Sequence, residues 1–221
     1  GLWFDRPSGG DYWLEFRQLW TANKSMMNGV SLRWAGGSTT LLDFNPGSTA
    51  GKDDHAITIG RTFSDTNVNL HITPIGKGHT YPESMDLVIN VGPFPNNQPP
   101  SVVACASTRS GSSGQTLRFV ATADDADGDA LACFWDFGDG DYSVDNGATT
   151  THIFSNEGEY VVHCTVSDMK GGIGQDAIVV RIDNPTTYTI RGRVLMTNGA
   201  PLVGARVSVS AARYAFIESD G

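Results

Sequence analysis

The sequence predicts an all-β protein built from tandem β-sandwiches, and three observations indicate this class. Apolar and polar residues alternate with a period of two in many short segments, as in Leu117-Arg118-Phe119-Val120. The 26 glycines and 10 prolines, together with Asn and Asp, separate nearly all of these segments. No segment shows the apolar repeat of an amphipathic helix. Short strands without helices are typical of a sandwich or a barrel.

Two proline-containing breaks divide the chain. The segment from Gly92 to Pro100 holds four prolines in nine residues, which favours an extended and stiff linker. The segment from Asp183 to Thr187 is a second, shorter break. These breaks predict three parts, at residues 1–95, 96–184 and 185–221.

The first part reads as a β-sandwich or jelly-roll-like domain. Tyr12, Leu14 and Phe16 alternate with Trp13, Glu15 and Arg17, which is the period of two expected of a strand. Further strands are expected at Val30 to Trp34, Thr40 to Phe44, Ala56 to Ile59, Val68 to Ile72 and Met85 to Val91.

The middle part has the clearest alternation, with four rows of apolar residues that each predict one buried strand face. These rows are Leu117, Phe119, Ala121 and Ala123; Cys133, Trp135 and Phe137; Tyr160, Val162, Cys164 and Val166; and Ile178, Val180 and Ile182.

A signature follows in the middle part, where residues 135–140 read Trp-Asp-Phe-Gly-Asp-Gly. An acidic turn at 125–129 precedes it, and Gly158-Glu159-Tyr160 and Val166-Ser167-Asp168 follow in order. With these motifs, residues 96–184 resemble the PKD (polycystic kidney disease) domain. The resemblance implies an immunoglobulin-like sandwich of two sheets, in which Trp135 and Phe137 fill the core.

Two further resemblances concern the flanking parts. The motifs at 12–17, 41–48 and 59–65 are similar to the β-rich region that follows the catalytic domain in secreted zinc metallopeptidases of the gametolysin and immune-inhibitor type. Residues 186–221 resemble the first half of a carboxypeptidase regulatory-like domain, which is a prealbumin-like sandwich. The predicted fold class is therefore all-β, with tandem β-sandwiches and a truncated third β-unit at the C-terminus.

Composition and motif spacing argue against several function classes. The net charge is −9, and no Lys/Arg cluster exists that could follow a phosphate backbone, so we expect no nucleic-acid partner. No apolar run approaches the ~20 residues that a membrane helix needs. The sequence contains no His-Glu-x-x-His run and no Gly-x-Ser-x-Gly elbow. We expect no catalytic residue and no zinc in this chain; a catalytic domain, if any, lies outside it.

The acidic run at 124–129 predicts a calcium site. Four carboxylates in six residues repel one another unless they are solvated or neutralised. In an immunoglobulin-like sandwich, the loop between the second and third strands lies at the same end as the loop between the last two. This topology brings Asp125 and Asp127 near Asp168 and the linker residue Asn97. Hard oxygen ligands suit Ca²⁺, and a solvated acidic turn is the alternative.

The three cysteines leave pairing open. Cys133 lies two residues before Trp135, and Cys164 lies two residues after Val162. If Trp135 and Val162 are opposite each other, antiparallel pairing also places the two cysteines opposite each other, which predicts a Cys133–Cys164 disulfide. Two free core thiols are the alternative, and Cys105 could compete for either partner.

The function predicted from these features is a non-catalytic accessory region of a secreted or cell-surface multidomain protein, a zinc metallopeptidase by resemblance. It would act as a rigid spacer that binds other domains of the same polypeptide and an extracellular protein or surface. A cell-surface adhesin or stalk is one alternative. A carbohydrate- or collagen-binding module is another, because the first part carries Trp3, Trp13, Trp20 and Trp34, and sugar sites stack on such rings.

Overall fold

The computed structural model describes residues 2–4, 10–19, 22–35, 38–48, 50–78 and 81–184. These residues belong to one compact unit, Gly1–Thr186. The predicted third β-unit at 185–221 lies outside the described residues, as does Trp20. Among the described residues, every helix is too short and too polar to cross a bilayer.

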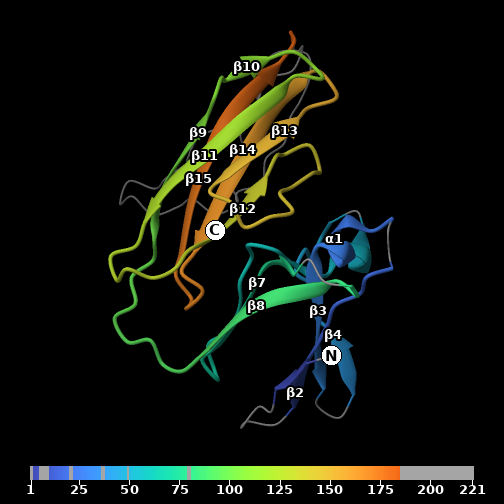
Figure 1. Cartoon of the computed structure of the whole chain (residues 1–221), viewed down its shortest axis with the longest axis vertical. Coiled ribbons are helices and arrows are strands. Elements are labelled where there is room, and N and C mark those ends of the chain that lie inside the picture. Colours follow the sequence, from blue (N-terminus) through green and yellow to red (C-terminus); the bar gives the residue numbers. More distant parts are fainter. Residues whose placement is uncertain are drawn as a thin grey trace, which may run out of the picture. The chain divides into compact units, whose positions relative to one another are not determined.

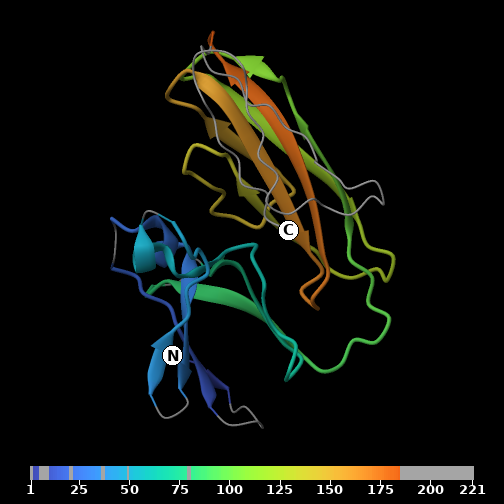
Figure 2. The same cartoon turned by 180° about the vertical axis from the view of Figure 1, so that it is seen from behind.

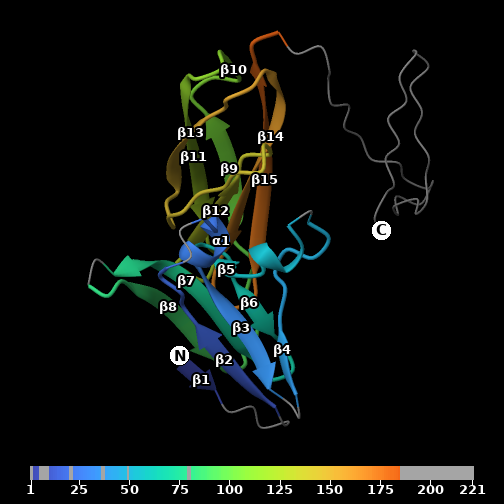
Figure 3. The ribbon, with the colours of Figure 1, turned by 90° about the vertical axis from the view of Figure 1, so that its right-hand side faces the viewer.

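Residues 2–91 form two antiparallel sheets, seen from the side in Figure 3. One sheet has the order β1-β2-β3-β4, and β5 pairs with the other end of β3. The other sheet has the order β6-β7-β8. The bounds are β1 Leu2–Phe4, β2 Asp11–Glu15, β3 Gly29–Ala35, β4 Thr39–Leu41, β5 Ile57–Thr58, β6 Phe63–Asp65, β7 Leu70–Gly78 and β8 Ser84–Val91.

Alternation in these strands builds the first hydrophobic core. In β2, Tyr12 and Leu14 are buried while Trp13 between them is exposed. They pack with Leu32 and Ile72, both of which are fully buried. The predicted strands are confirmed at β2, β3, β5, β7 and β8, whereas β4 stops at Leu41, before the predicted end.

Two short helices contradict the expectation that the chain contains none. The α-helix α1 (Lys24–Met27) begins after Asn23, whose side chain accepts a hydrogen bond from the Met26 amide. The 3₁₀-helix η1 (Gly51–Asp54) contains two acidic residues in its first turn. Each helix has four residues, so neither is long enough to show an apolar repeat in the sequence.

Residues 101–182 form a sandwich of two sheets, shown from opposite sides in Figures 1 and 2. One sheet has the order β10-β15-β14-β12 and the other has the order β13-β11-β9. The bounds are β9 Ser101–Ala106, β10 Ser110–Gly111, β11 Thr116–Asp124, β12 Ala132–Asp136, β13 Thr149–Ile153, β14 Gly158–Ser167 and β15 Ile173–Ile182.

The second core confirms the predicted inward rows. Leu117, Phe119, Trp135, Val162 and Val180 are all fully buried in one cluster. The Trp135 indole also donates a hydrogen bond to the carbonyl oxygen of Gly147 at 3.2 Å, so its polar atom is satisfied inside the core.

The Trp-Asp-Phe-Gly-Asp-Gly segment turns sharply after β12. Gly138 has φ +78°, and a Cβ atom at this position would lie 2.5 Å from the carbonyl oxygen of Val161. Only glycine accepts both this φ and this close approach without strain. The turn thereby brings Phe137 back into the core, where it is 2% exposed.

Specific contacts join the first two sheets to the sandwich. The Thr62 hydroxyl donates to the Ser167 hydroxyl at 2.8 Å, and the Asn90 side-chain Nδ2 donates to the Met169 carbonyl oxygen at 2.8 Å. Gly60 packs so closely on β12 that a Cβ atom would lie 2.1 Å from the Cys133 carbonyl oxygen. These contacts hold the two cores against each other within the one compact unit.

Candidate functional site

An acidic loop connects β11 to β12 and holds three carboxylates together. One oxygen each from Asp125, Asp127 and Asp129 lies within 4.8 Å of the other two, an arrangement that could hold a metal ion. The loop is shaped by Asp125, whose Oδ1 accepts hydrogen bonds from the amides of Asp127 and Asp129 at 3.0 and 3.1 Å. Gly128 at φ +75° completes the turn.

Two oxygens of this loop are shielded from solvent and have no hydrogen-bond partner in the structure. They are Asp125 Oδ2 and Asp129 Oδ2. Asp125 is only 9% exposed, so a bare carboxylate oxygen at this position is costly. Orphaned, hard oxygen atoms on a short loop are the donor set that Ca²⁺ accepts. The residues present therefore fit a calcium ion.

Asp168 and Asn97, the other two predicted ligands, are hydrogen-bonded to each other. Asp168 is 1% exposed and follows β14. Its Oδ1 accepts from the amides of Lys170 and Gly172, and its Oδ2 accepts from Gly172 and, at 2.6 Å, from the Asn97 side chain. Both oxygens of Asp168 thus accept hydrogen bonds from N–H groups. These bonds hold the turn at Lys170 and Gly172 and connect it to Asn97 of the linker.

Of the four predicted ligands, the structure groups Asp125 with Asp127 and, separately, Asp168 with Asn97. Asp127 meets the linker through its Oδ2, which accepts from the Gln98 amide at 2.7 Å. Asp129 completes the acidic group and was not predicted, although it belongs to the same acidic run.

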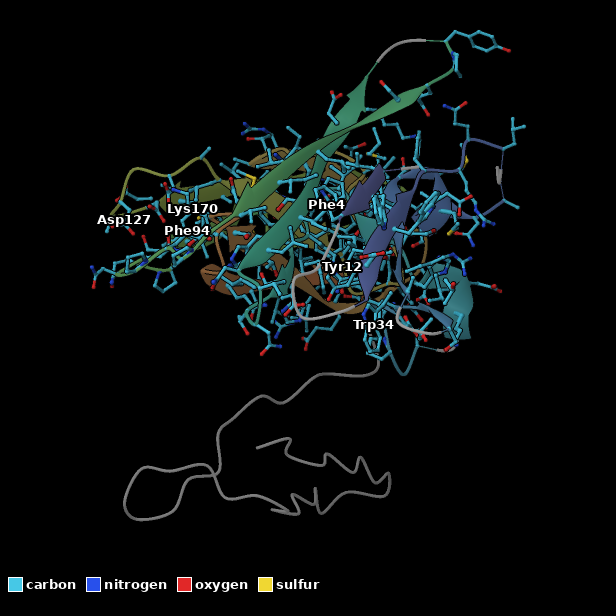
Figure 4. All side chains as sticks on the ribbon, turned by 90° about the horizontal axis from the view of Figure 1, so that it is seen from below. Phe4, Tyr12, Trp34, Phe94, Asp127 and Lys170 are labelled. Carbon is cyan, nitrogen blue, oxygen red and sulfur yellow. The ribbon has the colours of Figure 1, made fainter. Side chains whose placement is uncertain are left out.

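Lys170 supplies a cation that the sequence analysis did not anticipate. Its ammonium forms an ion pair with Asp129 Oδ1 and lies 5.5 Å from the ring centroid of the linker residue Phe94. The pKa of Lys170 is raised, first by the hydrogen bond with Asp129 and then by attraction from Asp129, Asp168 and Asp125. Figure 4 shows Lys170, Phe94 and Asp127 gathered at one end of the ribbon.

The acidic residues of the Trp-Asp-Phe-Gly-Asp-Gly turn are bound to neighbouring groups. Asp136 accepts from the Gly138 amide at 2.9 Å. Asp139 pairs with His152 at 2.7 Å, and Asp141 pairs with Lys24 of α1. These bonds fix the turn, as expected for Asp in tight loops.

A cleft of about 820 Å³ lies between the first two sheets and the sandwich. Its lining includes Ser25, Thr58 and Tyr142, whose hydroxyl groups are shielded from solvent and lack a hydrogen-bond partner. Burial raises the pKa of Tyr142 to about 12, so this phenol stays neutral at ordinary pH. The neighbouring Ser25 hydroxyl acts in the opposite direction and lowers this pKa. The distance and angle between Ser25 Oγ and the Tyr142 hydroxyl oxygen do not meet the geometry of a hydrogen bond.

Charges in this cleft favour a cationic ligand. The lining carboxylates are Asp53, Asp54, Asp136 and Asp141, and the lining cations are Lys24 and Arg61. Both cations lie over aromatic rings, Lys24 at 4.4 Å from the Tyr142 centroid and Arg61 at 5.4 Å from the Phe134 centroid. The cleft walls therefore already accept positive groups against rings and carboxylates.

The predicted disulfide is wrong in this structure. All three cysteines are free; Cys133 and Cys164 are buried and Cys105 is exposed. Trp135 pairs with Cys164 rather than with Val162, so Cys133 lies opposite Val166. Cys133 and Cys164 are therefore diagonal neighbours, whose Cα atoms are about 7–8 Å apart in such a pair, beyond the usual span of a disulfide.

The tryptophans of the first part lie in different settings. Trp3 and Trp13 are cross-strand partners and are 57% and 46% exposed. Trp34 is opposite Tyr12 and lines a shallow pocket with Phe63. Figure 4 shows Tyr12 and Trp34 on their neighbouring strands.

The fold and the turn define this middle part as an immunoglobulin-like β-sandwich. The PKD domain family model matches residues 97–182, and this part of the chain is a PKD domain. Its boundaries lie within one or two residues of the predicted 96–184.

Parts of this chain are similar to one curated protein and to solved PKD domains. Collagenase ColA of Clostridium perfringens is 43% identical over 58 residues, which are 26% of this chain and 5% of that protein. The chain thus corresponds to a small fraction of that relative's length. The PKD1 domain of the metalloprotease PrtV from Vibrio cholerae is 27% identical, with a TM-score of 0.34 over 39% of this chain and 99% of that one. The PKD1 domain of Vibrio anguillarum Epp is 25% identical, with a TM-score of 0.34 over 41% and 100%.

Proposed function

We propose that this chain is a non-catalytic accessory region of a secreted, multidomain zinc metallopeptidase, in which it acts as a rigid spacer stabilised by calcium. The similarity to a segment of a collagenase and to a PKD domain of a metalloprotease supports the class of parent protein. Residues 1–95 and 96–184 would be the two modules of the spacer. A cell-surface adhesin or stalk that uses the same modules is the alternative.

One observation supports rigidity above the others, namely the approach of Gly60 to the backbone of Cys133. A contact between two backbones leaves no long side chain to absorb relative motion. The bonds Thr62–Ser167 and Asn90–Met169 flank it, so the modules meet at several separate points. Pro99 and Pro100 also restrict the backbone φ angles of the linker.

Backbone nitrogen relaxation on the whole chain tests the spacer. We expect residues 22–78 and 101–182 to report one rotational correlation time, because a rigid pair tumbles as a single body. Two different correlation times would show that the modules move independently and would refute the proposal. The gene sequence upstream of this chain distinguishes the two hypotheses. A His-Glu-x-x-His segment there would indicate a zinc peptidase, and its absence would favour an adhesin.

Calcium would bind at Asp125, Asp127 and Asp129, beside the Asn97–Asp168 pair. The ion would neutralise the acidic loop and satisfy the two orphaned oxygens, Asp125 Oδ2 and Asp129 Oδ2. Extracellular calcium modules have dissociation constants of about 10⁻⁴ to 10⁻³ M, and we expect this range.

Isothermal titration of the whole chain with CaCl₂ tests this site. The double variant Asp125→Asn/Asp127→Asn should lose binding, whereas Asp145→Asn should bind like the wild type, because Asp145 is exposed and lies in a different loop. An absence of calcium binding by the wild type at millimolar concentration would eliminate the calcium part of the proposal.

A second candidate function, protein binding, is favoured by the cleft. Its four carboxylates outnumber its two cations, so a basic side chain would meet complementary charge there. Fluorescence anisotropy with labelled basic, acidic and neutral peptides and with labelled neutral oligosaccharides should show salt-sensitive binding of the basic peptide alone, weakened by Asp136→Asn. Preferential binding of neutral oligosaccharides would instead favour a carbohydrate-binding module, and equal binding of all probes would exclude a specific cleft.

A further inference from the structure

The acidic loop already holds a cation of its own. Lys170 belongs to the turn between β14 and β15, 41 residues from its partner Asp129. The side chains of the pair are 29% and 13% exposed, so the contact is partly shielded from solvent. Lys170 is thus a resident counter-ion at the place where a metal ion would bind.

Among the described residues, this ammonium forms an ion pair with one carboxylate, that of Asp129. Asp129 Oδ1 receives Lys170, while Asp129 Oδ2 and Asp125 Oδ2 stay without partners. One positive charge faces the three carboxylates of Asp125, Asp127 and Asp129, so the loop keeps an excess of negative charge. Lys170 therefore neutralises only part of the negative charge of the loop, and the remaining charge would attract an ion of higher charge.

We propose that Lys170 is the specificity-determining residue of this cation site: its ammonium competes with metal ions for the acidic loop, lowers their affinity and restricts binding to divalent ions. The inference rests on the calcium site proposed above. A monovalent ion offers the loop no more charge than Lys170 already does, and Lys170 is tethered, so it is present at a high local concentration. A divalent ion doubles the charge and accepts several oxygens at once.

The position of Lys170 is set independently of its ammonium. Its amide donates to Asp168 Oδ1 at 2.7 Å, and the Met169 amide donates to the Ser167 hydroxyl at 3.0 Å. These backbone bonds persist when the side chain changes. The variant Lys170→Met, which keeps the apolar stem beside Phe94, should therefore fold normally and remove only the competing charge.

Calorimetric titration with CaCl₂ and MgCl₂ measures the effect. Removing a positive charge a few ångströms from a divalent ion should tighten calcium binding by about ten- to thirtyfold, and sodium chloride should then compete more strongly in Lys170→Met than in the wild type. Lys170→Arg should resemble the wild type. Lys77→Met is the matched control, because it removes the same charge from another partly exposed ion pair, with Glu83 at 3.3 Å.

Amine labelling with mass spectrometry supplies a second readout. Calcium should increase the labelling of Lys170, because the ion releases its ammonium, and should leave the exposed Lys52 unchanged. If the wild type and Lys170→Met bind calcium with the same affinity, the role of Lys170 is overturned and the calcium site remains. Binding by neither protein would overturn both. Binding by Lys170→Met alone would show that Lys170 blocks the loop completely, and would overturn both the calcium site of the wild type and the selectivity for divalent ions.

Discussion

Gly60→Ala tests the contact on which the spacer proposal depends most. A methyl group at position 60 would lie 2.1 Å from the Cys133 carbonyl oxygen and 2.8 Å from its carbon, whereas C···O contacts in proteins are about 3.3–3.6 Å. The backbone of β12 must therefore retreat by about 1 Å. Gly60 also has φ +86°, which costs a residue with a Cβ about 1–2 kcal/mol.

The two costs can be separated with a matched variant. Gly47 has φ +85°, and no atom lies within 4 Å of its added Cβ, so Gly47→Ala carries the conformational cost alone. We expect Gly47→Ala to lower the free energy of unfolding by about 1–2 kcal/mol. Gly60→Ala should lower it by about 1–3 kcal/mol more, the usual range for overpacking.

Urea unfolding of the whole chain, followed by tryptophan fluorescence, gives both values. Amide spectra of the two variants add a local readout, because only Gly60→Ala should shift the signals of Cys133 and Phe134 in β12. Equal destabilisation by the two variants, with the β12 signals unchanged, would refute the packing of the first module on the PKD sandwich.

Three further predictions concern the PKD domain and its junction. Ellman's reagent should titrate only Cys105 in the folded chain but all three thiols in denaturant without reductant; a single thiol in denaturant would restore the disulfide. Asp168→Asn should lower the free energy of unfolding in urea by about 2–4 kcal/mol, because the new side-chain NH₂ would face N–H donors of Asn97 or Gly172 that now bind a carboxylate oxygen. An unchanged unfolding midpoint would contradict this role. Burial favours neutral Tyr142 in the folded state, so its contribution to stability is present below pH 10 and is lost as pH rises from 10 to about 12. An ultraviolet titration should show a phenol titrating near pH 12 that is absent in Tyr142→Phe, while Tyr160, whose pKa burial also raises, remains in both; an unchanged titration curve in Tyr142→Phe at high pH would count against it.

Alternation identified the faces of the strands but could not determine their register. Leu117, Phe119 and Val162 were predicted inside and are fully buried. The register between β12 and β14, by contrast, differs by two residues from the one that the disulfide required. A shift of two residues keeps every side chain on the same face, so burial patterns in the sequence are equally compatible with either register.

Local length and sequence distance explain the other omissions. The strands β1 and β6 have three residues each, too few to show a period. The acidic run was visible because its members are adjacent, and Asp129 could have been included from that run alone. Lys170 could not be linked to it, because only the β14–β15 turn brings the two segments together.

The turn from Asp168 to Gly172 also determines what calcium should change. Two of its contacts with the first module are made by the Met169 carbonyl oxygen, which accepts from the Asn90 side chain, and by Gly171, where a Cβ atom would lie 3.1 Å from the His71 ring. Neither contact uses the Lys170 side chain, so both remain when its ammonium leaves Asp129 and Phe94. Calcium should therefore raise the free energy of unfolding while the small-angle X-ray scattering curve stays the same. A calcium-dependent change in that curve would show that the linker, and not the turn, transmits the binding.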